Sequence, residues 1–210
     1  MSARERILAR IGKSLSGSTP AEIDAYLAAH PRGPAPTQLD NLVAHFKERA
    51  MQLSSDIIEI ADRTTIPAHL ARYLAERSLP PRGVCWPAFA SLPWGAANLE
   101  IAARPANSQD LVGITGAFCA IAETGTLMTL SGPETPPSNS LLPETHIAIM
   151  ETRRIIGSME DAWDLLRDEY TVPPRAVNFI SGPSRTADIE QTVTLGAHGP
   201  YRVLVFLVSG

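Results

Sequence analysis

The chain has 210 residues, of which 44% are hydrophobic and 19% charged, the composition of a globular protein that buries a single core. Its formal net charge of −4 gives no electrostatic basis for binding nucleic acid or an anionic membrane surface. No apolar run approaches the roughly 20 residues of a transmembrane helix. The N-terminus lacks the apolar core of a signal peptide, so we expect a cytoplasmic protein.

The first 36 residues are expected to form a helix followed by a connecting arm. "SARE", from Ser2 to Glu5, is a capping-box pattern, and an apolar stripe follows it at helical spacing. Residues 16–36 are rich in Gly, Ser and Pro around one brief helical stretch. This arm packs around the domain or reaches a partner, or it is a flexible tail, and the sequence favours neither interpretation.

From residue 37 onward, helical and strand patterns alternate. "TQLD" at Thr37 is a second capping box that predicts a helix, and Thr65 predicts another, with Pro67 in its first turn. Apolar runs predict strands at residues 56–61, 83–86 and 98–102. This alternation favours an α/β domain over residues 37–210, in which helices flank a parallel-dominated sheet.

The middle of the chain is rich in Gly, Thr and small apolar residues. Residues 119–122 and 126–130 are predicted strands that meet at a turn formed by Glu123, Thr124 and Gly125, where the glycine supplies a positive φ. Residues 131–143 are too rich in Pro for regular structure, and a loop of that length is often functional. Further predicted elements are a strand at 145–150, a helix capped by Ser158 and Asp161, and strands at 176–180 and 201–208.

The two cysteines, Cys85 and Cys119, stand apart from each other in apolar contexts, with no CxxC spacing and no histidine cluster nearby. Such cysteines are more often reduced core residues than a disulfide or a metal pair. We therefore expect no metal site in this chain and no iron–sulfur cluster carried by it alone.

The segment Ser181–Pro200 is unusually dense in polar side chains and lies between two predicted strands. We expect a Gly-Pro turn followed by one helix of roughly ten residues. Such a turn would direct free backbone N–H groups and the positive end of a helix dipole at one spot. Arg185 beside that spot would bind a carboxylate or phosphate with two parallel hydrogen bonds. The alternative is a local pair between Arg185 and Asp188 on one helical face.

Two titratable groups are candidates for chemistry. Glu123 follows an apolar run, so partial burial would raise its pKa and suit it to acid–base or nucleophilic work. Alternatively, it hydrogen-bonds the turn backbone. His198, in "GAHGP", is either a proton carrier or ligand to a bound group, or simply a helix C-terminal cap. The other histidines, His146 among them, are interpreted as structural or solvated.

Three stretches carry a family resemblance: "AIAETGTLMTLSG", "SLLPETHIAIM" and "ISGPSRTADIEQTVTLGAHGP". They resemble the LUD domain of the lactate utilization protein C (LutC/YkgG) family. The resemblance implies the fold shared by NagB, RpiA and the CoA transferases. It also implies a place in a cytoplasmic system that oxidises L-lactate to pyruvate, whose partner subunits carry iron–sulfur clusters, with no cofactor in this chain.

The same resemblance assigns site residues by motif. The matching positions of the AETG and GPSRTADIE–HGP signatures are Glu123, Thr124, Gly125, Ser184, Arg185, Thr186, Asp188 and His198. Three functions remain open. The first is a LutC-like component that binds a small anion such as lactate. The second is a stand-alone CoA- or acyl-handling enzyme with Glu123 as nucleophile, a comparison that rests on the fold alone. The third is a non-catalytic assembly module.

Overall fold

The computed structural model describes residues 2–14, 19–29, 39–187, 193–195 and 199–209. The chain divides into two compact units, residues 1–35 and 36–210. The first unit contains α1 (Ala3–Ser14) and α2 (Pro20–Ala29). The predicted capping box starts α1: the backbone N–H of Ser2 donates to Oε2 of Glu5 at 2.7 Å, and that of Glu5 donates to Oγ of Ser2 at 3.2 Å.

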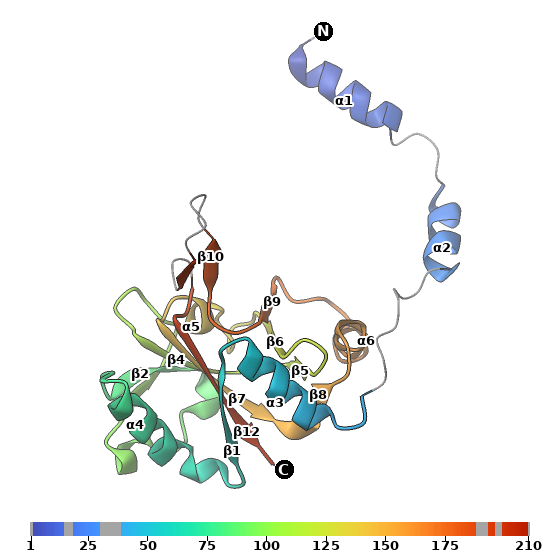
Figure 1. Ribbon diagram of the computed structural model, residues 1–210. Coiled ribbons are helices and arrows are strands. Elements are labelled where there is room, and N and C mark those ends of the chain that lie inside the picture. The colour runs from blue at the N-terminus through green and yellow to red at the C-terminus, as the bar shows by residue number, and fades with distance from the viewer. Residues whose placement is uncertain (1, 15–18, 30–38, 188–192, 196–198, 210) are drawn as a thin grey trace. The chain divides into compact units, whose positions relative to one another are not determined.

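A six-stranded, all-parallel sheet forms the centre of the second unit (Figure 1). Its strands lie in the order β1, β12, β7, β4, β2 and β3. The middle strands are almost entirely buried, as expected where both faces of a parallel sheet are covered. The bounds are β1 (Asp56–Ile60), β12 (Arg202–Val208), β7 (Thr145–Glu151), β4 (Val112–Gly116), β2 (Arg82–Cys85) and β3 (Glu100–Ala103). The predicted α/β class with a parallel sheet is confirmed.

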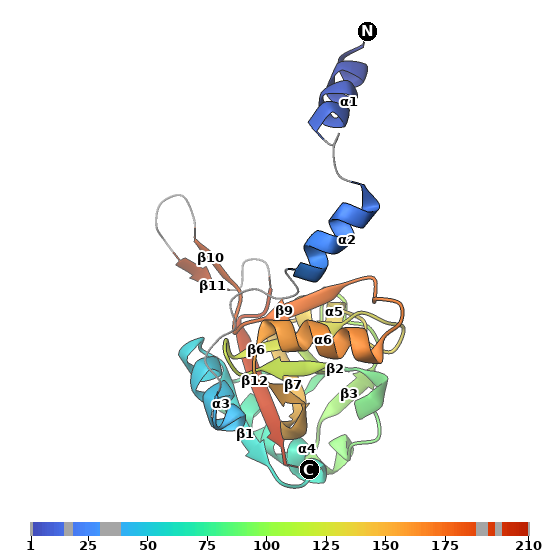
Figure 2. The same ribbon diagram turned by 90° about the vertical axis from the view of Figure 1, so that its right-hand side faces the viewer.

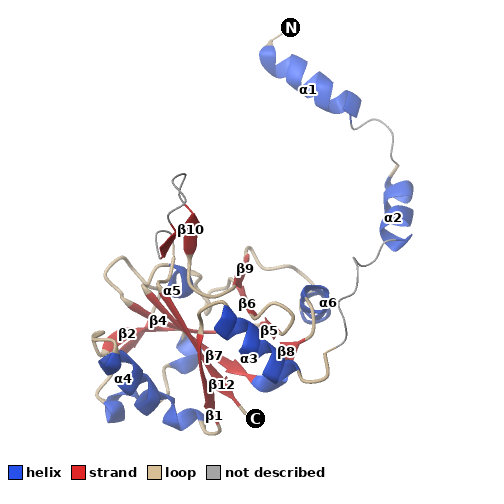
Figure 3. Ribbon diagram, viewed as in Figure 1, coloured by secondary structure: helices blue, strands red, loops and turns tan. Residues whose placement is uncertain are grey.

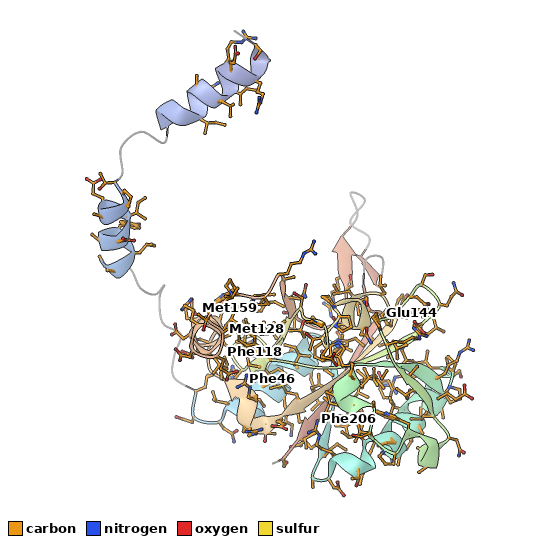
Figure 4. The ribbon with its side chains drawn as sticks, turned by 180° about the vertical axis from the view of Figure 1, so that it is seen from behind. Phe46, Phe118, Met128, Glu144, Met159 and Phe206 are labelled. Atoms are coloured by element: carbon orange, nitrogen blue, oxygen red, sulfur yellow. The ribbon has the colours of Figure 1, made fainter. Side chains whose placement is uncertain are left out.

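One face of this sheet is covered by α4 (Ile66–Glu76), which begins after Thr65 as predicted. Leu70 and Leu74 of α4 pack there with Ile147 of β7 and Phe206 of β12. Figure 4 shows Phe206 on the side of α4 and, on the other side, Phe46, Met128 and Met159. Short 3-10 turns occupy Arg63–Thr65, Pro87–Phe89, Trp94–Ala97 and Thr152–Arg154.

The opposite face is covered by α3 (Leu42–Gln52) and by a second, four-stranded sheet. This sheet contains β8 (Ile155–Ile156), β5 (Cys119–Ile121), β6 (Thr126–Leu130) and β9 (Val177–Ile180), in that order. The helix α6 (Met159–Glu169) packs on its outer side (Figure 2). The predicted β5–β6 hairpin is confirmed, with antiparallel pairing and a φ of 66° at Gly125.

The predicted cap of α6 is also present. The backbone N–H of Ser158 donates to Oδ2 of Asp161 at 3.0 Å, and that of Asp161 donates to Oγ of Ser158 at 3.2 Å. This reciprocal bonding satisfies two N–H groups that the first helical turn leaves free.

The helices differ from the sequence prediction in two places, one at a helix start and one in a loop. The helix expected from Thr37 begins at Leu42, and its N-cap is Asn41, whose Oδ1 accepts from the N–H of Ala44 at 3.0 Å. Thr37 itself lies outside the described residues. The proline-rich stretch 131–143 contains one helical turn, α5 (Ser138–Leu141), where no regular structure was expected.

The helix predicted within Ser181–Pro200 is wrong. Instead, β10 (Arg185–Ala187) pairs antiparallel with β11 (Val193–Leu195), as Figure 3 shows. The N–H of Ser184 donates to the carbonyl of Pro200 at 2.9 Å, so the two ends of the segment are held side by side. A hairpin meets that constraint because its strands satisfy each other's backbone groups. The preceding strand β9 belongs to the second sheet, whereas β12, which follows the hairpin, belongs to the parallel sheet.

Candidate functional site

Two predicted signature segments meet at the C-terminal end of α3. A Cβ placed on Gly125 would lie 2.4 Å from the backbone nitrogen of Ala50 and 2.6 Å from the carbonyl carbon of Arg49. A Cβ on Gly182, which has a φ of 74°, would lie 2.2 Å from the carbonyl oxygen of Leu53. Both turns therefore approach the helix backbone at a distance that only glycine allows.

A chain of hydroxyl groups connects the same two segments. Oγ1 of Thr124 donates to Oγ1 of Thr126 at 2.8 Å, and Oγ1 of Thr126 lies 2.6 Å from Oγ of Ser181. Thr126 is buried, whereas Thr124 and Ser181 are exposed. This series of hydroxyl groups is thus anchored by the buried Thr126 and ends at an exposed residue on each side.

Arg185 also reaches the end of α3. Its Nη2 donates to Oγ of Ser54 at 2.6 Å, and Ser54 directly follows the C-cap residue Leu53 in the left-handed conformation, with a φ of 69°. Among the residues that the structure describes, no carboxylate forms an ion pair with Arg185. The side chain is exposed, so its remaining N–H donors face solvent.

This geometry replaces the predicted electrostatics of the corner. Arg185 begins a strand, so the helix N-terminus expected to supply N–H groups there is absent. The adjacent helix end is the C-terminus of α3, which carries partial negative charge and favours a guanidinium nearby. A ligand anion at Arg185 would therefore depend on the guanidinium and the neighbouring hydroxyls rather than on a helix dipole.

Glu123 lies in the turn between β5 and β6. Its backbone N–H donates to the carbonyl of Gly157 at 3.0 Å, which ties the turn to the segment after β8. The residue is half-buried, and its carboxylate forms no hydrogen bond or ion pair with the described residues. A half-buried carboxylate without a partner can accept a proton or a hydrogen bond from a ligand.

The remaining predicted residues are placed unevenly. Ser184 is half-buried at the base of the β10–β11 hairpin. Thr186 is the middle residue of β10 and pairs with Thr194. Asp188 and His198 lie outside the described residues. The structure thus brings the Glu123–Gly125 turn and the Ser181–Arg185 segment together around α3.

His146 is a polar residue that sequence reasoning set aside. It lies on β7 with no exposed surface, and its Nε2 is 2.7 Å from Oγ1 of Thr115 on β4. Burial lowers the pKa of this imidazole to about 4, so the ring is neutral at pH 7. Its Nδ1 has no partner among the described residues. The available signal was a polar residue inside the apolar strand "THIAIM".

Two surface hollows lie away from these residues. One, of about 450 Å³, is bounded by Trp86, Phe118, Tyr170 and the loop at residues 131–135. Another, of about 440 Å³, lies beside Arg63, Glu151 and Arg153. Neither is lined by a residue of the AETG or GPSRTADIE–HGP signatures, but the first includes the start of the loop at residues 131–143 that was predicted to be functional. In the described part of the chain, no group of three or more His, Cys, Asp or Glu side chains is placed to hold a metal ion. None of the described helices is long and apolar enough to cross a membrane.

Comparison with known proteins gives a consistent result. The LUD domain model matches residues 96–208. The chain is 33% identical over 183 residues to lactate utilization protein C of Exiguobacterium sp., covering 80% of this chain and 78% of that protein. It is 36% identical over 133 residues to lactate utilization protein C of Bacillus subtilis, and 40% identical over 119 residues to that of Bacillus velezensis.

The matched regions cover 59% and 55% of this chain in the two Bacillus comparisons, and 53% and 47% of those proteins. The chain therefore spans about half the length of these curated relatives. Among solved structures, it resembles a DUF162 family protein from Deinococcus radiodurans, with a TM-score of 0.61 and 22% identity. That match covers 82% of this chain and 99% of the other, and it shows a shared fold.

Proposed function

Because the chain belongs to the LUD domain family and, within it, to the lactate utilization protein C family, we propose that it is a cytoplasmic component of a system that oxidises L-lactate to pyruvate. In this proposal it binds a small anionic ligand at the end of α3. The relatives' names supply the link to lactate utilization.

The observation that carries the ligand proposal is the state of Arg185. Its guanidinium is exposed, bonds the neutral hydroxyl of Ser54, and has no carboxylate partner among the described residues. A guanidinium can hold a carboxylate through two parallel N–H···O bonds. Lactate and pyruvate each have one carboxylate and one further oxygen, which the exposed hydroxyls of Thr124 and Ser181 can bond.

Glu123 is the group in this region best suited to proton transfer. It is next to the hydroxyl chain, is half-buried, and has no acceptor or donor bound to its carboxylate among the described residues. We assign it the acid–base role, together with His198 on the strength of its motif. Ser184, Thr186 and Asp188 complete the proposed ligand site as residues of the same signature.

The proposal also assigns the redox centres to partner subunits that carry iron–sulfur clusters. Cys85 packs in the hydrophobic cluster under α4, and Cys119 packs in the cluster under α6. The two thiols are therefore buried in separate parts of the domain and do not face a common space, as ligands to one cluster would.

The test compares Arg185→Ala with Arg167→Ala in lactate oxidation reconstituted with the partner subunits. Arg167 is an exposed arginine that pairs with Asp164 on the same helix, α6, so its removal changes the net charge equally. Loss of a charged hydrogen-bonding group from a ligand carboxylate is expected to reduce lactate-dependent turnover at low substrate by about tenfold or more. Full activity of Arg185→Ala would refute the proposed anion site.

A second candidate function, acyl or CoA handling, is favoured by one observation: the unpartnered carboxylate of Glu123. Incubation with an acyl-CoA followed by mass spectrometry would detect an acyl adduct on Glu123 that is missing from Glu123→Gln. If neither lactate, pyruvate nor CoA changes the melting temperature and no adduct forms, the assembly role remains. The exposed apolar side chains of α1 and α2 would then be the place to map a partner.

A further inference from the structure

The space between the two sheets is lined mainly by apolar side chains. Ala148 of β7, Leu127 of β6 and Ile180 of β9 belong to one buried hydrophobic cluster there. Successive side chains of a strand point to opposite faces, so residues two apart share a face. His146, Thr129 and Asn178 each stand two residues from a member of this cluster on its own strand. All three therefore face the space between the sheets.

These three residues carry hydrogen-bonding atoms that lack partners. Nδ1 of His146, Oγ1 of Thr129 and Nδ2 of Asn178 are buried, and none has a hydrogen bond in the described structure. His146 has no exposed surface, and Thr129 is 2% exposed. Buried polar atoms in native proteins are almost always bonded, because an unmet donor or acceptor destabilises the fold. Three such atoms on the facing surfaces of the two sheets call for an occupant.

The chemistry of the three atoms defines what would satisfy them. The amide nitrogen of Asn178 is a donor, and the hydroxyl of Thr129 is both donor and acceptor. When Nε2 of His146 donates its proton to Thr115, Nδ1 is an acceptor. A matching ligand therefore presents a hydroxyl or a water-like donor to the imidazole and acceptor oxygens to the other two groups.

The geometry also provides a route to this space. Thr129 and Asn178 are register partners on β6 and β9, and β9 is the edge strand of the second sheet. Asn178 is half-buried as a residue although its Nδ2 is buried, as expected for a residue near the edge of the sheet. The same two strands lead to the hydroxyl pair of Thr126 and Ser181 at their other end.

We propose that a small 2-hydroxy carboxylate binds between the two sheets, at a second site apart from Arg185, with hydrogen bonds to His146, Thr129 and Asn178. The ligand class rests on the proposed function, whereas the residues are new to it. The carboxylate oxygens accept from Thr129 and Asn178, and the 2-hydroxyl donates to Nδ1 of His146. Thr115 acts as a positioning residue because it holds the other nitrogen of the imidazole.

Thr145 offers a matched control. It precedes His146 on β7, has no exposed surface, and carries an unpartnered Oγ1, but it faces the opposite side of the sheet with Ile147. Thr129→Val and Thr145→Val are the same near-isosteric change, and each removes one unpartnered hydroxyl. Both variants should fold as well as the unmodified chain.

The experiment titrates L-lactate, with pyruvate as the comparison that lacks the donor hydroxyl, into the full chain and both variants, measured by calorimetry. Thr129→Val should bind about three- to tenfold more weakly than the unmodified chain, and Thr145→Val should bind equally well. In parallel, ¹⁵N NMR of the imidazole, assigned with His146→Phe, should show Nδ1 of His146 shift on ligand addition in both the unmodified chain and Thr145→Val.

Equal affinities of the two valine variants for L-lactate, an unmoved Nδ1 signal, or no binding of L-lactate up to millimolar concentrations would overturn the proposal and leave ordered water as the occupant. The first two outcomes are independent of the Arg185 test, whereas absence of binding would also contradict the anion site at Arg185. If Arg185→Ala is inactive and the two valine variants bind with equal affinity, the site between the sheets is rejected and the proposed function is retained. If Thr129→Val binds more weakly and Arg185→Ala is fully active, the site between the sheets is retained and the anion site at Arg185 is rejected.

Discussion

Replacing Gly125 with alanine should destabilise the second unit by about 2–4 kcal/mol. This glycine has a φ of 66°, in the left-handed region, and its Cα faces the last turn of α3. An alanine Cβ would lie 2.4 Å from the backbone nitrogen of Ala50 and 2.8 Å from Cβ of Arg49. Because the obstructing atoms are mainly backbone, the helix or the turn must move as a unit.

The magnitude follows from three contributions. Holding a residue with a Cβ in the left-handed conformation costs about 1–2 kcal/mol. Overpacking a well-filled contact costs a further 1–3 kcal/mol or so. The lower entropy of the unfolded alanine chain returns about 0.4–1 kcal/mol. The sum is a large fraction of the roughly 5–15 kcal/mol that stabilises a typical domain.

Urea denaturation followed by circular dichroism measures this loss, with Gly95→Ala as the control. Gly95 lies in the Trp94–Ala97 turn, and a Cβ there would meet no atom within 4 Å. Its replacement should change the free energy of unfolding by less than about 0.5 kcal/mol. A loss below about 1 kcal/mol for Gly125→Ala would mean that the turn and α3 do not pack as described.

Three other outcomes are expected. Ser158→Ala removes the reciprocal cap of α6 and should lower the free energy of unfolding by about 1 kcal/mol in the same assay. His146 has an ordinary pKa of 6.5 and a pKa of about 4 when buried, so unfolding takes up a proton between these values. The free energy of unfolding contributed by the neutral ring is fully present above pH 6.5 and is lost toward pH 4, a loss of about 3 kcal/mol relative to His146→Phe. Parallel profiles of unfolding free energy against pH for the two proteins would contradict this. Burial raises the pKa of Cys85 to about 11 and that of Cys119 to about 12, so neither thiol should react with Ellman's reagent at pH 8 before unfolding, and rapid native labelling would show that one is accessible.

The fold was largely predictable where local pattern and burial agree. The apolar runs that became β7 and β12 were identified because strands buried on both faces need apolar side chains on both. The turn at Gly125 was predicted because a tight hairpin requires a positive φ. The strand β4 was not predicted, because its two glycines lack the side chains that mark a strand in sequence.

The site was less predictable, because its contacts join distant parts of the chain. A hairpin stands where a helix was expected after Ser184. Its ends are joined by the bond from the N–H of Ser184 to the carbonyl of Pro200, a contact that no local pattern encodes. The bond from Arg185 to Ser54 spans 131 positions. Similarly, the residues next to His146 do not show that it faces a second sheet, whose strands come from segments both before and after it in the sequence.

The position of β12 has a consequence for how the domain is synthesised. This strand is the last one described, yet it lies between β1 and β7 and pairs with both along its length. While a ribosome is still making residues 202–208, β1 and β7 each have an unpaired side and cannot join. The nascent chain therefore exposes two open strand edges until β12 itself has been made, and such edges are places where another chain can pair.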